Sequence, residues 1–302
     1  GVGVACATQC SERVMAAAAG AEGLSGTKRL GVKASTASEP LITAEQWAHF
    51  DREGYVVLDR FQVLPEGGVE KLQRRIDQIM LGEADVPFDK LMMQLDSETG
   101  RYEDSGPQTL GHKGATLTYR KIQNLEHDKV FRDYIAHPLF EEACRRVYGQ
   151  GSVSAFRIMF FNKPAGRGTH LPWHQDRWQH LDRDPLLTVW TALDDSSPLN
   201  GCVQVIPRSH LGGVVNQEHH SAFLTAEQSA EHCSDAKVVD LELAAGQVAL
   251  LHNWTIHRSG VNSSKAMARR AFSVNYMDGC TRLADMDKHQ THMRGNKTTG
   301  YA

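Results

Sequence analysis

Hydrophobic positions in the first half of the chain recur at the spacings of short helices and one strand. Thr43 stands before an apolar-periodic run and Gln46 follows three residues later, so the pair predicts a capping box at a helix N-terminus. Residues 55–58, Tyr-Val-Val-Leu, predict a β-strand. Apolar residues recur at helical spacing over 69–79 and again over 129–147, which predicts two further helical regions.

After residue 153 the pattern changes to short strand-like runs separated by turn signals, such as the stretches 164–166 and 198–201. The predicted strands are 156–162, 187–193, 202–206, 238–243, 248–252 and 270–276. Many short strands joined by turns are typical of a sandwich or barrel. The pattern therefore predicts helices first and then an antiparallel double-sheet barrel.

The two ends of the chain differ from this middle part. Residues 1–42 are rich in Ala, Gly, Ser and Thr with scattered basic residues, which fits either a disordered leader or a transit peptide. We expect one domain over 43–302, with a helical N-terminal part 43–150, a β core 151–280 and a C-terminal tail 281–302. Within that tail, residues 285–294 are either a loosely ordered end or a lid.

Composition narrows the classes of partner. The 302 residues carry a formal net charge of −3 with no basic stripe, so nucleic acid is not an expected partner. No run reaches 18 apolar residues, so we expect no membrane span. The six cysteines form no CxxC pair, which favours free thiols over a zinc knuckle. We expect an intracellular monomer or homodimer, cytoplasmic or, if the leader is a transit peptide, organellar.

The segment His174-Gln175-Asp176 places two metal-ligand types two residues apart. In an extended strand such residues point to the same face, so both can coordinate one ion. A histidine from a distant strand would complete two imidazoles and one carboxylate, the facial triad of non-haem Fe(II) oxygenases, which leaves positions for a keto acid and dioxygen. His257, after the predicted strand 248–252, is the expected third ligand.

Arg269 strengthens this interpretation, since an HxD pattern is a weak signal in a chain with 15 histidines. Strand alternation places Arg269, Ala271, Ser273 and Asn275 on one face of the predicted final strand. An arginine facing inward is costly unless it meets an anion. A dicarboxylate cosubstrate would supply that anion through a bidentate guanidinium–carboxylate pair.

Three further segments carry a resemblance to a known family. They are Trp190-Thr-Ala-Leu-Asp-Asp195, Asn200-Gly-Cys-Val-Gln-Val-Ile-Pro-Arg-Ser-His210, and His257-x-Ser259-Gly260-x-Asn262 with Arg269-Arg270-Ala271. Together with residues 50–58, they make the stretch 43–277 resemble the phytanoyl-CoA dioxygenase family. The resemblance implies a mainly β fold with flanking helices and a double-stranded β-helix core, which is a jelly-roll, cupin-like architecture.

The resemblance also implies roles for single residues. It makes His174, Asp176 and His257 the iron ligands and catalytic centre. It makes Arg269 the residue that binds the distal carboxylate of 2-oxoglutarate, because the Arg-Arg-Ala-Phe-Ser pattern aligns Arg269 rather than Arg270. The other cosubstrate-binding residues that it implies are Ser259, Lys121, Met159 and Trp190. His210 and His252 are expected to support the structure rather than bind metal, and Asn200-Gly201 is expected to be a turn.

The implied enzyme is a non-haem Fe(II)/2-oxoglutarate-dependent dioxygenase that hydroxylates a small molecule and releases succinate and CO2. Its cofactors and cosubstrates are Fe(II), 2-oxoglutarate and dioxygen. Asp176 argues for hydroxylation, since halogenases of this fold carry Gly or Ala at that position. The same iron chemistry giving desaturation, epoxidation or ring formation in natural-product biosynthesis is an alternative. A catalytically silent metal-binding or interaction domain is another, although neither a ligand nor the arginine is missing.

The substrate is the least determined part of the prediction. Gln123, Arg177 and Trp178 are candidates for the walls of its site. Arg177, with Arg167 and Arg183, could favour an anionic substrate, although solvated surface arginines are the default. Acyl-CoA, amino acids and small natural products all remain open.

Overall fold

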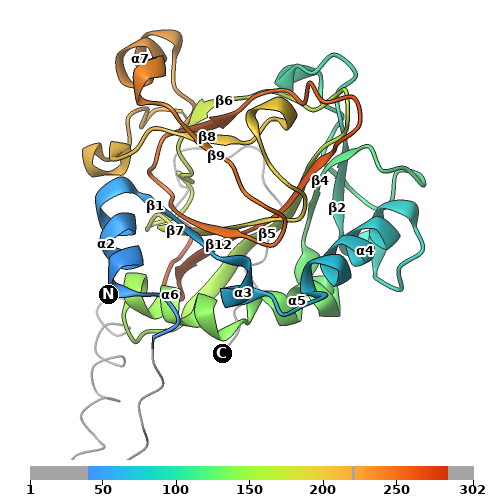
Figure 1. Cartoon of the computed structure of the whole chain (residues 1–302), viewed down its shortest axis with the longest axis horizontal. Coiled ribbons are helices and arrows are strands. Elements are labelled where there is room, and N and C mark those ends of the chain that lie inside the picture. The colour runs from blue at the N-terminus through green and yellow to red at the C-terminus, as the bar shows by residue number, and fades with distance from the viewer. Residues whose placement is uncertain (1–39, 220–221, 285–302) are drawn as a thin grey trace, which may run out of the picture. The chain divides into compact units, whose positions relative to one another are not determined.

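The computed structural model describes residues 40–219 and 222–284, which belong to one compact unit beginning at Pro40 (Figure 1). The expected leader therefore lies outside the described residues except for its last three positions. The segment 285–294, considered above as a lid, also lies outside them.

Short helices flank the sheets. Their bounds are α2 Ala44–Glu53, α3 Arg60–Val63, α4 Gly68–Leu81, α5 Lys129–Ile135, α6 Pro138–Tyr148 and α7 Ala226–His232. The predicted capping box is confirmed, because Thr43 Oγ1 accepts the Gln46 N–H at 3.1 Å and Gln46 Oε1 accepts the Thr43 N–H at 2.9 Å. The helical region predicted over 129–147 consists of two helices, and Pro138 begins the second, as its preference for a first helical turn suggests.

The strands form two antiparallel sheets in the described part of the chain. One sheet has the order β1-β10-β7-β12-β5-β4-β2-β3, and the other has the order β6-β11-β8-β9. The strand bounds are β1 Tyr55–Leu58, β2 Met92–Leu95, β3 Thr109–Leu110, β4 Tyr119–Gln123, β5 Val153–Lys163, β6 Leu171–His174, β7 Leu187–Ala192, β8 Val203–Val205, β9 Val239–Leu241, β10 Val248–His252, β11 His257–Ser259 and β12 Arg269–Asp278. The predicted cupin-like jelly roll is confirmed.

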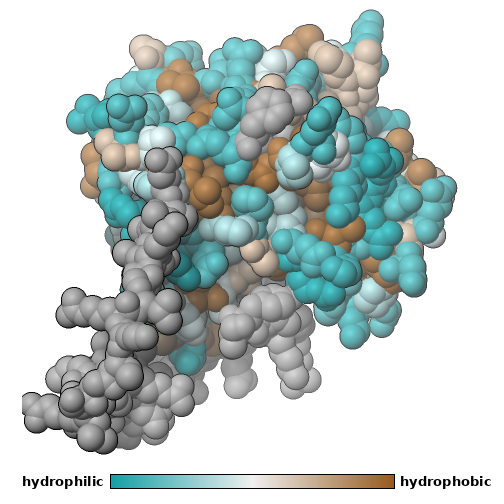
Figure 2. All heavy atoms as spheres, turned by 60° about the horizontal axis from the view of Figure 1, so that its bottom comes forward, coloured by the Kyte–Doolittle hydropathy of each residue, from teal (hydrophilic) through white to brown (hydrophobic). Residues whose placement is uncertain are grey.

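The larger sheet separates two kinds of packing. Its outer face packs on the helices, where Ile76 of α4, Phe131 of α5 and Leu139 of α6 join one apolar core with Val189 of β7 and Val274 of β12. In Figure 1 these helices lie along the side of the larger sheet that faces away from β6 and β8. Its inner face turns toward the smaller sheet, and the site described below lies between them. Figure 2 shows the helical side of the surface, where hydrophilic side chains surround smaller hydrophobic areas.

Strands β2, β3, β4 and β11 were not among the predicted runs, and β4 lies beside the site. β4, Tyr-Arg-Lys-Ile-Gln, is polar in sequence, yet all five of its residues are buried. β2 pairs with β4 on the side away from β5. The stretch 96–114 is irregular apart from one short 3₁₀ turn and the two-residue strand β3. In the described part of the chain, no helix has the length and apolar character needed to cross a bilayer.

Candidate metal centre and cosubstrate site

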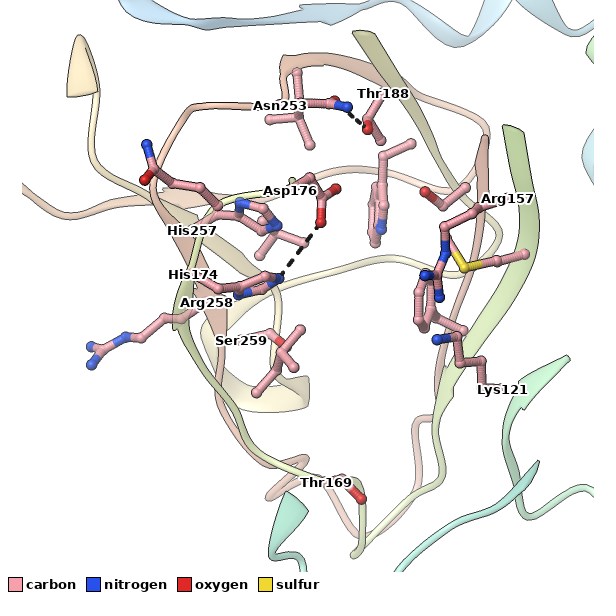
Figure 3. Close-up of a pocket in the computed structure, with 18 of the residues that line it drawn as sticks. Lys121, Arg157, Thr169, His174, Asp176, Thr188, Asn253, His257, Arg258 and Ser259 are labelled. Carbon is pink, nitrogen blue, oxygen red and sulfur yellow. Dashed lines mark hydrogen bonds and ion pairs between the residues drawn. The ribbon is translucent and has the colours of Figure 1, made fainter. Parts of the chain in front are cut away.

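His174, Asp176 and His257 come together as predicted, with one ligand atom of each within 4.8 Å of the others. β6 carries His174, β11 carries His257, and the two residues are direct partners in the antiparallel pairing of these strands. Their ring centroids lie 4.1 Å apart, and His174 Nε2 lies 3.9 Å from Asp176 Oδ1 (Figure 3). Two imidazole nitrogens and a carboxylate oxygen therefore converge on one point.

Both histidines are held in the same tautomer by their own strands. His174 Nδ1 lies 2.9 Å from the Pro172 carbonyl oxygen, and His257 Nδ1 lies 2.9 Å from the Thr255 carbonyl oxygen. A carbonyl oxygen only accepts, so each Nδ1 carries the proton and each Nε2 offers a lone pair. Burial, with His257 beside it, lowers the pKa of His174 to about 3, so this ligand is neutral at physiological pH.

Asp176 reaches the cluster differently from the prediction. The prediction that one strand carries both His174 and Asp176 is wrong, because β6 ends at His174. The chain after β6 is positioned by the Asp176 N–H, which donates to the Asn253 carbonyl at 2.8 Å. Asn275 Nδ2 donates to Asp176 Oδ2 at 3.4 Å and leaves Oδ1 directed at His174. The hydrogen bonds of the loop after β6 therefore place Asp176 beside His174, a placement that strand alternation was expected to produce.

Arg269 lies on the inner face of β12, as its alternation predicted. It is 4% exposed, and its Nε is buried without a hydrogen-bond partner. Its guanidinium lies 5.6 Å from the centre of the Trp190 ring, and burial lowers the pKa of Arg269 to about 10. A buried cation with an unused donor is unstable alone and suits a bound anion.

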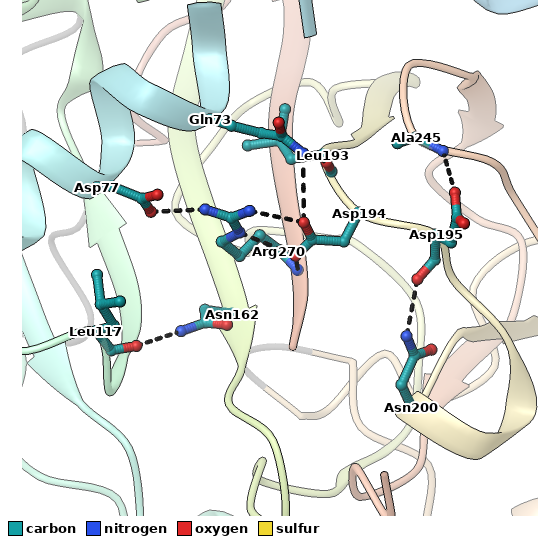
Figure 4. A network of polar contacts seen from close by, with 10 residues as sticks. All are labelled: Gln73, Asp77, Leu117, Asn162, Leu193, Asp194, Asp195, Asn200, Ala245 and Arg270. Carbon is teal, nitrogen blue, oxygen red and sulfur yellow. Dashed lines mark hydrogen bonds and ion pairs between the residues drawn. The ribbon is translucent and has the colours of Figure 1, made fainter. Parts of the chain in front are cut away.

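The adjacent Arg270 has the opposite environment on the outer face. Its guanidinium donates to Asp194 at 2.8 and 2.9 Å and to Asp77 of α4 at 2.6 Å (Figure 4). These carboxylates raise its pKa although burial opposes them. Arg270 therefore joins the sheet to a helix, and the unsatisfied arginine of the pair is Arg269.

A cavity of about 190 Å³ contains the cluster and Arg269. The predicted site residues that line it are Lys121, Met159, His174, Asp176, Arg177, Trp178, Trp190, His257, Ser259 and Arg269. Burial, together with Arg157 and Arg120, lowers the pKa of Lys121 well below its usual value, and Asp176 partly offsets this. The two histidines expected to support the structure, His210 and His252, pack on each other with their ring centroids 5.0 Å apart.

Gln123 is placed differently from the other predicted wall residues. It is buried but is not among the residues that line the cavity. Its Oε1 accepts a hydrogen bond from Arg157, which does line the cavity and was not predicted. The sequence signal for Arg157 was a charged residue between Phe156 and Ile158, inside an otherwise apolar strand.

The fold and this cluster define the class of protein as a non-haem iron oxygenase, since two histidines and one carboxylate beside a buried arginine suit iron and a 2-oxo acid. The chain belongs to the phytanoyl-CoA dioxygenase family, whose model matches residues 50–271. The predicted family and enzyme class, an Fe(II)/2-oxoglutarate-dependent dioxygenase, are thereby confirmed.

Individual relatives have low sequence identity to this chain, but the alignments cover most of both proteins. A probable phytanoyl-CoA dioxygenase of Caenorhabditis elegans is 24% identical over 265 residues, which cover 82% of this chain and 78% of that protein. The structure of EctD from S. alaskensis with 2-oxoglutarate and 5-hydroxyectoine has a TM-score of 0.64 at 22% identity and covers 85% of this chain and 84% of its own. The carbocyclase SnoK from nogalamycin biosynthesis has a TM-score of 0.60 at 19% identity, with coverages of 86% and 94%. These two structural likenesses show the fold alone.

Proposed function

We propose that this oxygenase hydroxylates a small-molecule substrate, with conversion of 2-oxoglutarate to succinate and CO2. His174, Asp176 and His257 hold the iron, and Arg269 binds the distal carboxylate of 2-oxoglutarate. The binding site of the cosubstrate is lined by Ser259, Lys121, Met159 and Trp190. The observation that carries the proposal is the convergence of two Nε2 atoms and one carboxylate oxygen beside a buried arginine with an unused Nε donor.

The donor set fits Fe(II). Two neutral imidazoles and one carboxylate are the ligands of the facial triad, and the Nδ1–carbonyl hydrogen bonds orient both rings before any ion binds. When bound, iron activates dioxygen with the keto acid as co-reductant and supplies the oxidation of a carbon–hydrogen bond.

The protein's own residues position the reactants. The Arg269 guanidinium has a planar fork that matches a carboxylate, and the Trp190 ring beside it restricts where that fork points. Ser259, at the end of β11, offers a hydroxyl from the opposite sheet. The Lys121 ammonium has no hydrogen bond to any of the described residues and lies 5.4 Å from the Phe161 ring centre, so it is available to a ligand oxygen. Binding an anion there would favour its charged form.

Asp176 supports hydroxylation over halogenation. Halogenases that resemble this fold have a small residue at the corresponding position, which opens a coordination position for halide. Here the carboxylate is present, and Asn275 directs one of its oxygens toward His174. Ring formation or desaturation would use the same ligands, so product analysis separates these outcomes.

The test is anaerobic titration of the protein with Fe(II) and 2-oxoglutarate, following the weak visible charge-transfer band of the chelate. We expect a band in the wild type, and its loss together with succinate formation in His174→Ala and Asp176→Ala. Absence of the band in the wild type would refute the proposal and favour a catalytically silent domain. A band that persists in both variants would refute the ligand assignment.

We also propose an intracellular location, cytoplasmic or organellar. Cys144, Cys202 and Cys233 are buried free thiols, which suits a reducing compartment. Fractionation of cells expressing the full-length protein tests this, and recovery from the secreted fraction would contradict it.

A further inference from the structure

Arg157 occupies a strained position in β5. It has φ +54°, a left-handed conformation that few residues other than glycine adopt. Ile158 pairs with Val274 and Phe156 pairs with Asn275, so Arg157 is the extra residue of a β-bulge. Bulges beside active sites redirect a side chain, and strain retained at such a position points to a function.

The Arg157 side chain is held toward the cavity. Its Nη2 donates to Gln123 Oε1 at 3.2 Å, and its guanidinium carbon lies 5.6 Å from the centre of the Trp178 ring. Gln123 is fixed in turn by donating to Gln108 Oε1 at 2.6 Å. Figure 3 shows Arg157 on the wall of the cavity opposite His257. The guanidinium is therefore oriented by neutral groups.

No carboxylate in the described ranges 40–219 and 222–284 lies within ion-pair distance of Arg157. Arg177 and Arg183 differ, because Asp184 lies 3.7 Å from the first and Asp278 lies 2.8 Å from the second. Burial lowers the pKa of Arg157, with Asp176 the foremost group opposing it, and a bound metal would engage that carboxylate. The cation thus lacks a permanent counter-charge.

Arg157 and Arg269 stand at opposite ends of one row of inward side chains. Arg269 pairs with Lys163, and Arg157 lies six residues before Lys163 on the same strand. At the rise per residue of an extended strand, the backbone positions of Arg157 and Arg269 are about 20 Å apart. Asp176 contacts Asn275, which pairs with Phe156 next to Arg157, so the iron site lies near the Arg157 end of this row. A cosubstrate that reaches from iron to Arg269 leaves Arg157 free.

We propose that Arg157 binds an anionic group of the substrate, a carboxylate or a phosphate, at the end of the cavity away from Arg269. This inference rests on the proposed function above and deepens it to a substrate class: small acids. Gln123 is a positioning residue for Arg157, and the Trp178 ring covers one face of the guanidinium. Pairing with an oxyanion supplies the counter-charge that the described residues do not.

The experiment uses the full chain with Fe(II) and 2-oxoglutarate under argon. The probes are small carboxylic acids, each beside its primary amide, and phosphate monoesters, each beside its parent alcohol. Binding is followed as a shift of the chelate band. We expect acids of one set to bind at least about tenfold more tightly than their neutral partners, since charge-assisted hydrogen bonds are stronger than neutral ones. The set that binds distinguishes carboxylate from phosphate.

Two variants assign the preference to Arg157. Arg157→Gly keeps the φ +54° backbone without strain and removes the cation, so the acid should bind about 10- to 100-fold more weakly. Arg157→Lys keeps the charge but loses the planar fork and should retain part of the preference. Arg183→Gln is the matched control, since it removes an exposed, paired arginine and should change nothing.

The outcomes separate the two proposals. Absence of the band in the wild type refutes the proposed function itself. With the band present, the inference is overturned if no acid binds, if neutral partners bind equally well, or if Arg157→Gly retains the acid preference. Gln123→Leu should weaken the preference while the band persists, and an unchanged preference would exclude its positioning role.

Discussion

Replacing Arg269 by methionine should stabilise the protein without ligands while removing its response to 2-oxoglutarate. Arg269 is 4% exposed and its Nε is unsatisfied, so without a bound anion its charge is almost uncompensated. The fall of its pKa from the ordinary value to about 10 corresponds to about 3 kcal/mol of unfavourable burial. Methionine fills a similar volume but loses the contact with the Trp190 ring, so we expect a net gain of about 1–3 kcal/mol.

The assay is urea unfolding at neutral pH with Mn(II) present throughout, compared with and without 2-oxoglutarate. A ligand at a hundred times its Kd stabilises the folded wild type by about 2.7 kcal/mol. Arg269→Met should show almost none of this increase, because the distal carboxylate has lost its partner. The reasoning is refuted if the ligand-free variant unfolds at lower urea than the wild type, or if its gain from 2-oxoglutarate equals that of the wild type.

Arg270→Met is the matched control one residue away. Arg270 donates to both Asp194 and Asp77, and its removal leaves two carboxylates without their cation. The partly exposed network should lose about 2–4 kcal/mol of stability, less than a fully buried pair. The same chemical change should therefore have opposite effects on stability at neighbouring positions, and only Arg269 should affect the response to cosubstrate.

Three other substitutions test the surroundings of the site. Burial, together with His210, lowers the pKa of His252 from 6.5 to about 4. The unfolded chain therefore takes up the proton first as the pH drops, and the folded protein loses about 2 kcal/mol of stability by about pH 5. His252→Gln should reduce that loss in urea unfolding, and equal losses in the variant and the wild type would contradict the assignment. Gly201→Ala should cost about 2–4 kcal/mol in the same assay, because φ is +78° and an added Cβ would lie 2.8 Å from the Gly260 carbonyl oxygen. Gln175→Leu removes three hydrogen bonds to backbone groups, at 2.6–2.8 Å, and should cost about 3 kcal/mol of stability. The Val215 amide should then exchange its hydrogen faster, and an unchanged exchange rate would exclude the anchoring of this amide by Gln175.

The sequence predicted those parts of the site that depend on local periodicity and ligand chemistry. Strand alternation correctly placed Arg269 inward, and the spacing of His174 and Asp176 correctly paired them in space. The structural cause of this pairing differs from the prediction, since β6 ends at His174 and the Asn253 carbonyl positions Asp176. That contact joins residues 77 positions apart, and no local pattern encodes it.

The missed features depend on tertiary context. Strand β4 has no apolar alternation because Arg120 and Lys121 are buried beside the cavity and not in the apolar core. The Arg157 bulge adds one residue within a run of strand-forming residues, and the run marks Arg157 by its charge but not as an extra residue. Functional sites are where sequence rules for buried positions are expected to fail.

The bulge also sets the parity of β5. From Lys163 back to Met159, odd-numbered residues pair with inward positions of β12, whereas beyond the bulge Phe156 and Ser154 pair with Asn275 and Met277. Consecutive residues Phe156 and Arg157 consequently both approach the Trp178 ring. Deleting Arg157 would restore regular alternation while the other residues of β5 kept their partners on β12, so one inward cation would be lost and the iron ligands on other strands would stay in place. In such a fold, a one-residue insertion or deletion can change substrate choice without any substitution in the metal centre.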